Sequence, residues 1–229
     1  MNDSALHDSS FTFNDTVRMT FSPSIHFVSG KGGVGKSTFA LALAQRFAAS
    51  GQRTVMVELG EQSYAVRALE IPLDPGYVPK ATAYGFELAL LEGLDCLKEY
   101  AAHLLRSQRL ANLLLENKTL RTFINVAPAL REIAILGKVT SHLRQHGPSL
   151  TADKVVIDAP STGHFLSLLR APRGLSETVK FGPMGEQSRS IQKVLGDSNA
   201  VAYWVVSLPE TFAVEESQEL MQTLKQEFS

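Results

Sequence analysis

The sequence has little cysteine, no surplus of charge and no long apolar run, and each absence excludes a class of protein. Cys96 is the one cysteine among 229 residues, which excludes an internal disulfide framework and a zinc site built wholly from thiolates of one chain. The 22 Lys and Arg balance the 23 Asp and Glu, and a formal charge of -1 supplies no electrostatic drive for binding nucleic acid or anionic lipid. With 44% apolar and 20% charged residues, the composition is instead that of a compact protein with a packed core.

Targeting signals are also missing from the chain as given. The first 22 residues are polar, with Arg18 as the one Lys or Arg, and they lack the charged start and apolar middle of a secretory signal. Apolar runs such as Val201 to Val206 are far shorter than the roughly 20 residues that span a bilayer. We therefore expect a polar leader over residues 1–22, one domain over residues 23–229, no transmembrane segment and a cytoplasmic location.

The order of the predicted elements indicates an α/β fold. An apolar run at residues 25–28 leads through glycines into a helix-forming stretch at residues 37–49, and a second apolar run follows at residues 54–57. Strand, helix, strand in this order is a βαβ unit, which implies a parallel sheet. Residues 154–158 and 200–206 are predicted to add strands, and an apolar stripe predicts a last helix over residues 214–228.

About fifty residues between these strands are helical in character. Asp95 is a candidate N-cap, and apolar residues recur after it at helical spacing. The stretch is too long for one crossover helix, so we expect several, with breaks near Asn117, Pro128 and Gly137. The predicted fold is thus a mostly parallel sheet flanked by helices, with a helical insert at about residues 94–147.

The segment from Gly30 to Ser37 matches the phosphate-binding loop pattern, in which two glycines five positions apart precede lysine and serine. Glycines let successive main-chain N–H groups turn inward around an anion, and the positive end of the next helix faces it. Lys36 is expected to reach the β- and γ-phosphates of ATP, and the Ser37 hydroxyl to hold Mg²⁺. A chance match is expected roughly 0.01 times in a chain of this length, and the required strand and helix flank the loop.

The string Gly-Lys-Gly-Gly-Val-Gly-Lys-Ser-Thr resembles the deviant Walker A loop of the ATPases that include MinD, ParA, ArsA and the nitrogenase iron protein. The resemblance implies that Lys31 reaches the nucleotide of a partner subunit, that Thr38 contacts the α-phosphate, and that ATP drives dimerisation. Without the resemblance, Lys31 is an ordinary solvated loop lysine. The expected nucleotide-binding residues are Gly30, Lys31, Gly32, Gly33, Val34, Gly35, Lys36, Ser37 and Thr38.

Asp158 ends an apolar strand, where a carboxylate often starts a turn. Because parallel strands place their carboxyl ends at one edge, Asp158 is predicted to lie beside Lys36 and Ser37 and to hold Mg²⁺ through water. With Lys31 and Lys36 it completes the expected catalytic set.

The residues after Asp158 resemble the switch II segment of the arsenite pump-driving (ArsA) and tail-anchored-protein targeting ATPases. The proline is shifted by one position, but the Thr-Gly-His ending, which MinD and ParA proteins lack, is kept. Segments 126–132, 169–173 and 208–211 also look like bacterial members of this family. The resemblance assigns the switch II role to Pro160, Thr162, Gly163 and His164.

The sequence departs from the family at switch I. An aspartate that positions the attacking water is expected where Gly60 stands. Loss of such a group can cost several orders of magnitude in rate, since phosphoryl transfer depends on positioning. Glu58 or Glu61 either replaces it or is a surface carboxylate. Hydrolysis is therefore expected to be slow or to require a partner subunit.

The thiol sites of the family are absent too. Its eukaryotic targeting members close their dimer with a Cys-x-x-Cys zinc site, and its arsenite pumps use several thiols, whereas Cys96 stands alone and is interpreted as a small packed residue. His142 and His146, four positions apart, could share a helix face as ligands. With no thiol or carboxylate near them in sequence, we interpret them as a solvated pair.

The insert is rich in leucine, and two interpretations remain open. Apolar residues at helical spacing usually pack in a core, whereas in the targeting branch they line a groove that shields a client's transmembrane segment. The residues concerned are Leu104, Leu105, Leu110, Leu113, Leu114, Leu115, Phe123, Ile124, Ile133, Ile135 and Leu136.

Together these patterns predict a Mg-ATP-dependent dimeric switch ATPase of the ArsA-like family, coupled to a partner or client protein. The dimer is formed with a second copy or with a homologous ATPase. The alternative is a nucleotide-binding regulatory subunit with weak or no hydrolysis that pairs with an active homologue. A ParA- or MinD-like positioning ATPase is disfavoured by the near-zero charge and by the lack of a basic C-terminal amphipathic helix.

Overall fold

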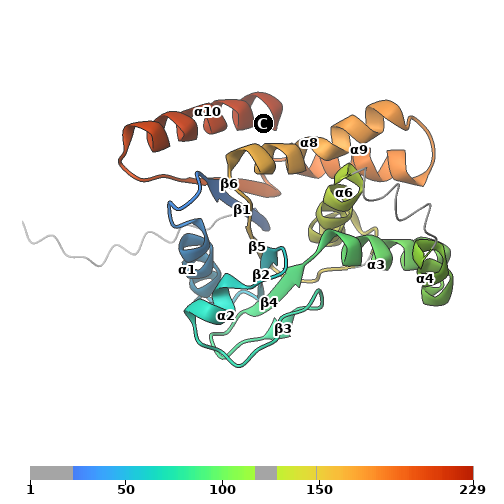
Figure 1. The fold of residues 1–229 in the computed structure, drawn as a ribbon, viewed down its shortest axis with the longest axis horizontal. Helices are drawn as coiled ribbons and strands as arrows, with labels where there is room; N and C mark the ends of the chain where they lie inside the picture. Colours follow the sequence, from blue (N-terminus) through green and yellow to red (C-terminus); the bar gives the residue numbers. More distant parts are fainter. Residues whose placement is uncertain (1–22, 117–127, 148, 229) are drawn as a thin grey trace, which may run out of the picture.

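The fold was obtained as a computed structural model, which describes residues 23–116, 128–147 and 149–228 (Figure 1). Within them, six strands form one sheet in the order β3-β4-β2-β5-β1-β6. Neighbouring strands run parallel except for the antiparallel pair β3–β4. The strands are β1 (Ile25–Gly30), β2 (Thr54–Leu59), β3 (Lys80–Ala81), β4 (Glu87–Leu91), β5 (Lys154–Asp158) and β6 (Val201–Val206).

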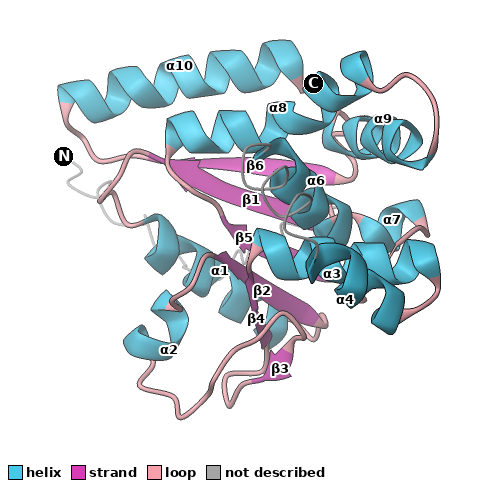
Figure 2. Cartoon of the chain, turned by 45° about the vertical axis from the view of Figure 1, so that its right-hand side comes forward, coloured by secondary structure: helices cyan, strands magenta, loops and turns pink. Residues whose placement is uncertain are grey.

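Helices connect and cover these strands on both faces of the sheet (Figure 2). The crossover helices and the C-terminal helix are α1 (Lys36–Ala49), α2 (Tyr64–Ala68), α8 (Thr162–Thr178), α9 (Pro183–Leu195) and α10 (Thr211–Glu227). Between β4 and β5 the chain forms α3 (Gly93–Leu105), α4 (Gln108–Glu116), α6 (Pro128–Val139) and α7 (Ser141–Arg144).

The core lies on both faces of the sheet because alternate residues of each central strand point to opposite sides. Phe27 and Val57 belong to a cluster that includes buried residues of α3, α6, α8, α9 and α10. Val28 and Met56 belong to the opposite cluster, which includes buried residues of α1 and α2. Strands covered on both faces read as continuous apolar runs, which is why they could be recognised in the sequence.

The mostly parallel α/β architecture predicted from the sequence is confirmed, and β3 and β4, at one edge of the sheet, are additional to it. Residues 1–22 and the predicted break at Asn117 lie outside the described residues. A helix does start at Pro128, and the break predicted near Gly137 falls at Thr140, between α6 and α7. A Cβ at Gly137 would lie 2.6 Å from Nε2 of Gln187, so glycine here permits close packing of α9. In the part of the chain that the structure describes, no helix is long and apolar enough to cross a membrane.

Candidate functional site

The loop between β1 and α1 (residues 31–35) depends on glycine for its backbone conformation. Gly33 and Gly35 have φ angles of 84° and 91°, in the left-handed region that glycine adopts without a steric penalty, and Gly35 caps α1. A Cβ on Gly30 would lie 2.2 Å from the carbonyl oxygen of Val206, so the approach of β1 to β6 also requires glycine. Backbone geometry therefore explains the glycine at three positions of the motif.

Lys36 is the first residue of α1, and its half-buried side chain folds back over this loop. Its Nζ donates a hydrogen bond to the carbonyl oxygen of Lys31 at 3.0 Å. Two positions later, the exposed Thr38 shares a hydrogen bond of 2.8 Å with the hydroxyl of Tyr64 on α2. The ammonium group is thus held at the loop into which the motif places phosphates. Of the remaining loop residues, Val34 is buried and Gly32, Gly33 and Gly35 are exposed.

Asp158 lies at the carboxyl edge of the sheet beside the start of α1, where the parallel topology predicts it. In register it pairs with Val28 of β1 and Glu58 of β2. Burial raises the pKa of Asp158, and a hydrogen bond with the Ser37 side chain opposes that rise. The negative charge of Glu58 raises this pKa further, whereas the positive charge of Lys36 lowers it. A lysine, a serine and two carboxylates therefore meet at the glycine-rich loop.

These groups fit a Mg²⁺ ion bound with phosphates. The Ser37 hydroxyl and the Asp158 carboxylate are oxygen ligands of the kind that Mg²⁺ prefers, and such sites usually combine few protein ligands with phosphate and water. A cation would also compensate the burial of Asp158, which disfavours the charged form of this carboxylate. The described residues contain no cluster of three or more His, Cys, Asp or Glu side chains able to hold a metal by themselves.

Glu58 is neither a surface carboxylate nor a free group able to position water, because it is buried and its carboxylate is already hydrogen-bonded. It is 3% exposed, and its carboxylate accepts hydrogen bonds from the Ser63 hydroxyl and from the backbone N–H of Ala65, the latter at 2.9 Å. The Ser63 hydroxyl in turn accepts from the N–H of Val66 and caps α2. Glu58 therefore anchors the segment that follows β2. Glu61, by contrast, is exposed.

Replacement of Glu58 by alanine is expected to lower the free energy of unfolding by about 1–3 kcal/mol, because two buried donors lose their acceptor. Relief of the repulsion from Asp158 offsets part of this loss. Urea unfolding followed by circular dichroism measures the change. The matched control, Glu61→Ala, should stay within about 0.5 kcal/mol of the wild type. Equal stability of the two variants would contradict the anchoring role.

Gly60 stands where the sequence resemblance leads us to expect an aspartate that positions water. Its φ angle is 119°, and its N–H donates to the carbonyl oxygen of Leu91 at 3.1 Å, which ties the end of β2 to β4. A Cβ at this position would meet no atom within 4 Å, so packing does not demand glycine, although the positive φ favours it. This position therefore supplies no carboxylate to the site.

The predicted switch II residues run from the end of β5 into the first turn of α8. The carbonyl oxygen of Pro160 accepts a hydrogen bond from the hydroxyl of Ser29 at 2.8 Å, which joins this segment to β1. Thr162 begins α8, and its Oγ1 is buried with no hydrogen-bond partner among the described residues. Gly163 and His164 follow in the same turn and are exposed. The segment predicted as switch II is thus in direct contact with β1, the strand that leads into the loop.

Lys31 points to a neighbour that the sequence did not indicate. Its Nζ lies 5.8 Å from the centre of the Phe212 ring, in the first turn of α10. Phe212 is 76% exposed, so the two side chains form a cation–π contact at the surface of the subunit. Such an exposed contact is worth about 0.5–1 kcal/mol. Little free energy therefore holds the lysine in this place.

The cysteine prediction is confirmed, and the histidine prediction is wrong in part. Cys96 is 2% exposed, and burial raises the pKa of its thiol to about 12, which makes it a packed apolar residue. His142, on α7, is half-buried, and this burial lowers the pKa of its ring. His146 is exposed and stands edge-on to His103, with 6.0 Å between the ring centres. The two histidines are therefore not a solvated pair.

Comparisons with known proteins agree with this site. A family model described as anion-transporting ATPase matches residues 24–184. The ATPase BagA of Mycobacterium tuberculosis is 31% identical over 215 residues, which cover 88% of this chain and 61% of BagA. The arsenical pump-driving ATPase of Escherichia coli is 26% identical over 164 residues, which cover 71% of this chain and 28% of that protein. The ATPase GET3C of Arabidopsis thaliana is 23% identical over 261 aligned positions, which cover 94% of this chain and 66% of GET3C. The chain thus spans less than two thirds of the length of its mycobacterial relative.

Proposed function

We propose, because the chain belongs to the family of anion-transporting ATPases, that it is a Mg-ATP-dependent switch ATPase that acts as a dimer and is coupled to a partner or client protein. The observation that carries this proposal is the meeting of Lys36, Ser37 and Asp158 at a glycine-rich loop. Together they offer a cation for the phosphates of ATP and oxygen ligands for its Mg²⁺.

In this proposal the loop and the start of α1 bind the triphosphate. Its anionic oxygens face the amino end of a helix of 14 residues, where backbone N–H groups are unsatisfied. Lys36 exchanges its hydrogen bond with the Lys31 carbonyl for the β- and γ-phosphates. Ser37 directly, and Asp158 through a water molecule, would hold Mg²⁺, which would neutralise phosphate charge.

Hydrolysis is the step for which the chain is least equipped. Gly60 offers no side chain, and the carboxylate of Glu58 already accepts two hydrogen bonds within its own subunit. Glu61 is exposed and has no fixed partner to orient it in the described part of the chain. We therefore propose slow hydrolysis by the isolated protein, with faster turnover only where a partner supplies the missing group.

The same observation favours a second candidate, a nucleotide-binding regulatory subunit. A protein that binds Mg-ATP without splitting it can use the nucleotide to hold one shape and to recruit a more active homologue. Gly60 supports this candidate, whereas Asp158 is fully compatible with either.

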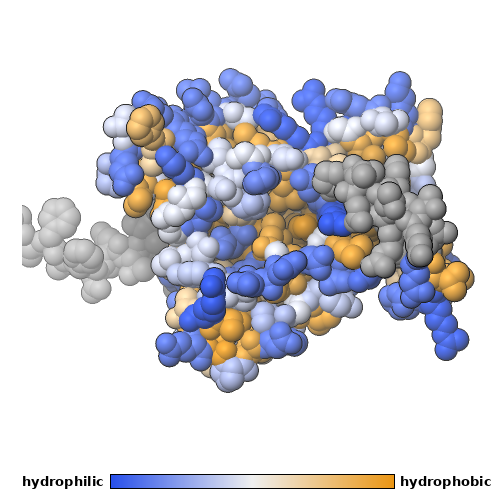
Figure 3. Space-filling model, viewed as in Figure 1, coloured by the Kyte–Doolittle hydropathy of each residue, from blue (hydrophilic) through white to orange (hydrophobic). Residues whose placement is uncertain are grey.

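A client protein is a further proposal that rests on the insert. Ile133 and Leu136 are buried in the core, whereas exposed leucines remain on α3 and α4. They are Leu104 (42%), Leu105 (41%), Leu110 (57%) and Leu113 (72%). On the face seen in Figure 3, apolar residues occur at the position of α4 and at separate places elsewhere, with polar residues between them. The exposed leucines are consistent with an apolar client segment. Coordination of a metalloid by thiols is less consistent with the structure, because Cys96 is buried.

Single-turnover hydrolysis tests the proposal and separates its two forms. Protein in excess over radiolabelled ATP and Mg²⁺ should release phosphate, and Asp158→Asn should slow that release by about a hundredfold or more, since metal and phosphate positioning carry the catalysis. Nucleotide binding without any release, alone or with a homologous ATPase, would favour the regulatory subunit. Failure to bind Mg-ATP at all would overturn both forms.

A further inference from the structure

Helix α8 connects the switch II segment to the rest of the molecule. Its first turn carries Thr162 and His164, and its 17 residues pack against α6 and α9 (Figures 1 and 2). Arg170 links it to Glu227 at the end of α10. A displacement of the first turn of α8 would therefore reach these helices. The size of their response would depend on the contacts on either side of Pro172.

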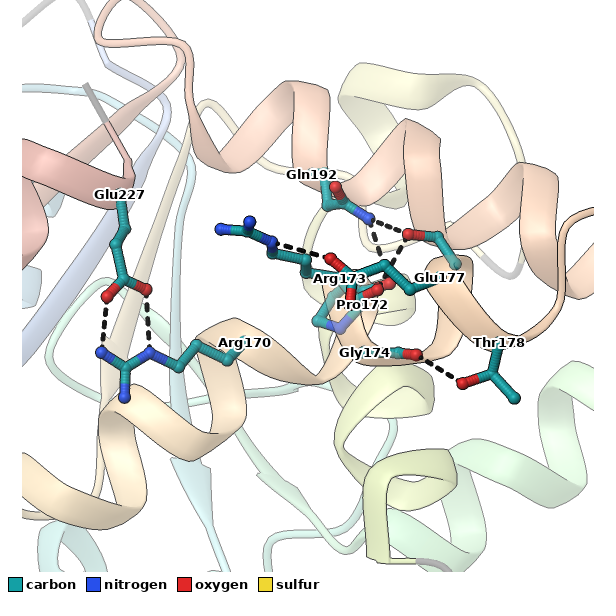
Figure 4. A network of polar contacts seen from close by, with 9 residues as sticks. Arg170, Pro172, Arg173, Gly174, Glu177, Thr178, Gln192 and Glu227 are labelled. Atoms are coloured by element: carbon teal, nitrogen blue, oxygen red, sulfur yellow. Dashed lines mark hydrogen bonds and ion pairs between the residues drawn. The ribbon is translucent and has the colours of Figure 1, made fainter.

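Side-chain hydrogen bonds hold the middle of α8 at Arg170 and its C-terminal half after Pro172 (Figure 4). Gln192 of α9 donates to the carbonyl oxygen of Pro172 at 3.0 Å and to the hydroxyl of Ser176 at 2.7 Å. Arg170 forms two hydrogen bonds with the carboxylate of Glu227 at the end of α10. Pro172 has no N–H, so the helix lacks one backbone hydrogen bond just where this fastened half begins.

The N-terminal half of α8 meets the insert through Glu132 of α6. Oε1 of Glu132 accepts a hydrogen bond from the hydroxyl of Ser167 at 3.3 Å. His164 lies one turn earlier on the same face of α8, because residues three apart are neighbours on a helix. Burial raises the pKa of Glu132, while the Ser167 hydrogen bond and the positive charge of His164 lower it. The half-buried carboxylate of Glu132 thus interacts with two groups in the first turns of α8, the hydroxyl of Ser167 and the charge of His164.

We propose that Glu132 is a positioning residue that passes a movement of His164 and the first turn of α8 to the helical insert. The inference rests on the proposed function, in which ATP moves the switch II segment. It adds the specific contact through which that movement reaches α6, the helix that packs against α3. Two of the exposed leucines, Leu104 and Leu105, lie at the end of α3. Pro172 separates the moving turn of α8 from Ser176, which is held by Gln192 of α9.

Hydrogen–deuterium exchange with and without Mg²⁺ and a non-hydrolysable ATP analogue tests this role. In the wild type, nucleotide should slow exchange in the first turn of α8 and in α6. In Glu132→Gln, which keeps the shape but removes the charge, the effect in α8 should persist and the effect in α6 should shrink by about threefold to tenfold. The matched control is Glu177→Gln, the same change at an exposed position of α8 that pairs with Arg173. It should behave as the wild type.

Ser167→Ala serves as a second variant, since Ser167 is exposed and its loss should leave folding intact. It should also weaken the effect in α6 while nucleotide affinity, measured by calorimetry, stays within about twofold of the wild type. An undiminished response of α6 in both variants would overturn the role of Glu132. A wild type that binds nucleotide but shows no change in α8 would instead contradict the proposed switch itself.

Discussion

Lys36→Ala is expected to weaken the binding of Mg-ATP by at least about a hundredfold, which would put it beyond detection by calorimetry at ordinary protein concentrations. The side chain lies at the glycine-rich loop, with its Nζ 3.0 Å from a loop carbonyl oxygen. Charge-assisted hydrogen bonds to phosphate are among the strongest that a lysine forms, and here they would be made close to a buried carboxylate. Without Lys36, less positive charge would remain to offset the repulsion between the triphosphate and the carboxylates of Asp158 and Glu58.

The effect should be confined to binding. Lys36→Ala removes one hydrogen bond within the subunit, so its free energy of unfolding should fall by only about 1 kcal/mol. Lys193→Ala, an exposed lysine of α9, is the matched control and should bind nucleotide as the wild type does. Titration of both variants with ATP and Mg²⁺ gives the comparison. If Lys36→Ala kept wild-type affinity, the nucleotide would have to bind away from this loop.

Much of this site could be predicted because its parts depend on local sequence or on topology. Gly33 and Gly35 follow from the backbone conformation that the loop requires, and Lys36 and Ser37 from their fixed places after it. The position of Asp158 followed from a rule that holds for every parallel sheet, namely that carboxyl ends share an edge. No side-chain packing had to be known for either step.

Glu58 could not be assigned because its role depends on packing. Its carboxylate accepts hydrogen bonds from Ser63 and from the N–H of Ala65. Nothing in the sequence around Glu58 indicates that these groups fold over it. The signal that could have helped is serine as the N-cap of a short helix after the strand. The strand Glu87–Leu91 was missed for a similar reason, because a short apolar run beside a helical stretch fits either element.

The contact of Lys31 with Phe212 could not be predicted either, because it depends on the tertiary fold. Phe212 is 181 positions away in the sequence, and register pairing of Gly30 with Val206 brings the end of β6, and with it the start of α10, beside the loop. The lysine therefore has a place on its own subunit that a motif alone does not reveal. Because the contact is exposed and weak, the lysine can leave it for a stronger, anionic partner.

Lys31→Ala is accordingly expected to keep nucleotide binding within about threefold of the wild type and to lose nucleotide-dependent dimerisation. A lysine that reaches a phosphate across an interface exchanges a cation–π contact of about 0.5–1 kcal/mol for a charge-assisted pair of about 1.5–3 kcal/mol in each subunit. Two such pairs related by symmetry amount to a net of about 1–5 kcal/mol, which would shift the dimer equilibrium by about fivefold to several thousandfold. Light scattering with and without a Mg-ATP analogue measures the shift.

The variant Phe212→Ala separates this role from a structural one. It removes the contact on the same subunit but leaves the ammonium group of Lys31, so nucleotide-dependent dimers should form at least as readily as in the wild type. If the lysine were only a surface residue packed on the ring, both variants would instead behave alike. Equal dimer formation by Lys31→Ala and the wild type would contradict the interface role, and the family's deviant loop would then serve nucleotide binding within one subunit.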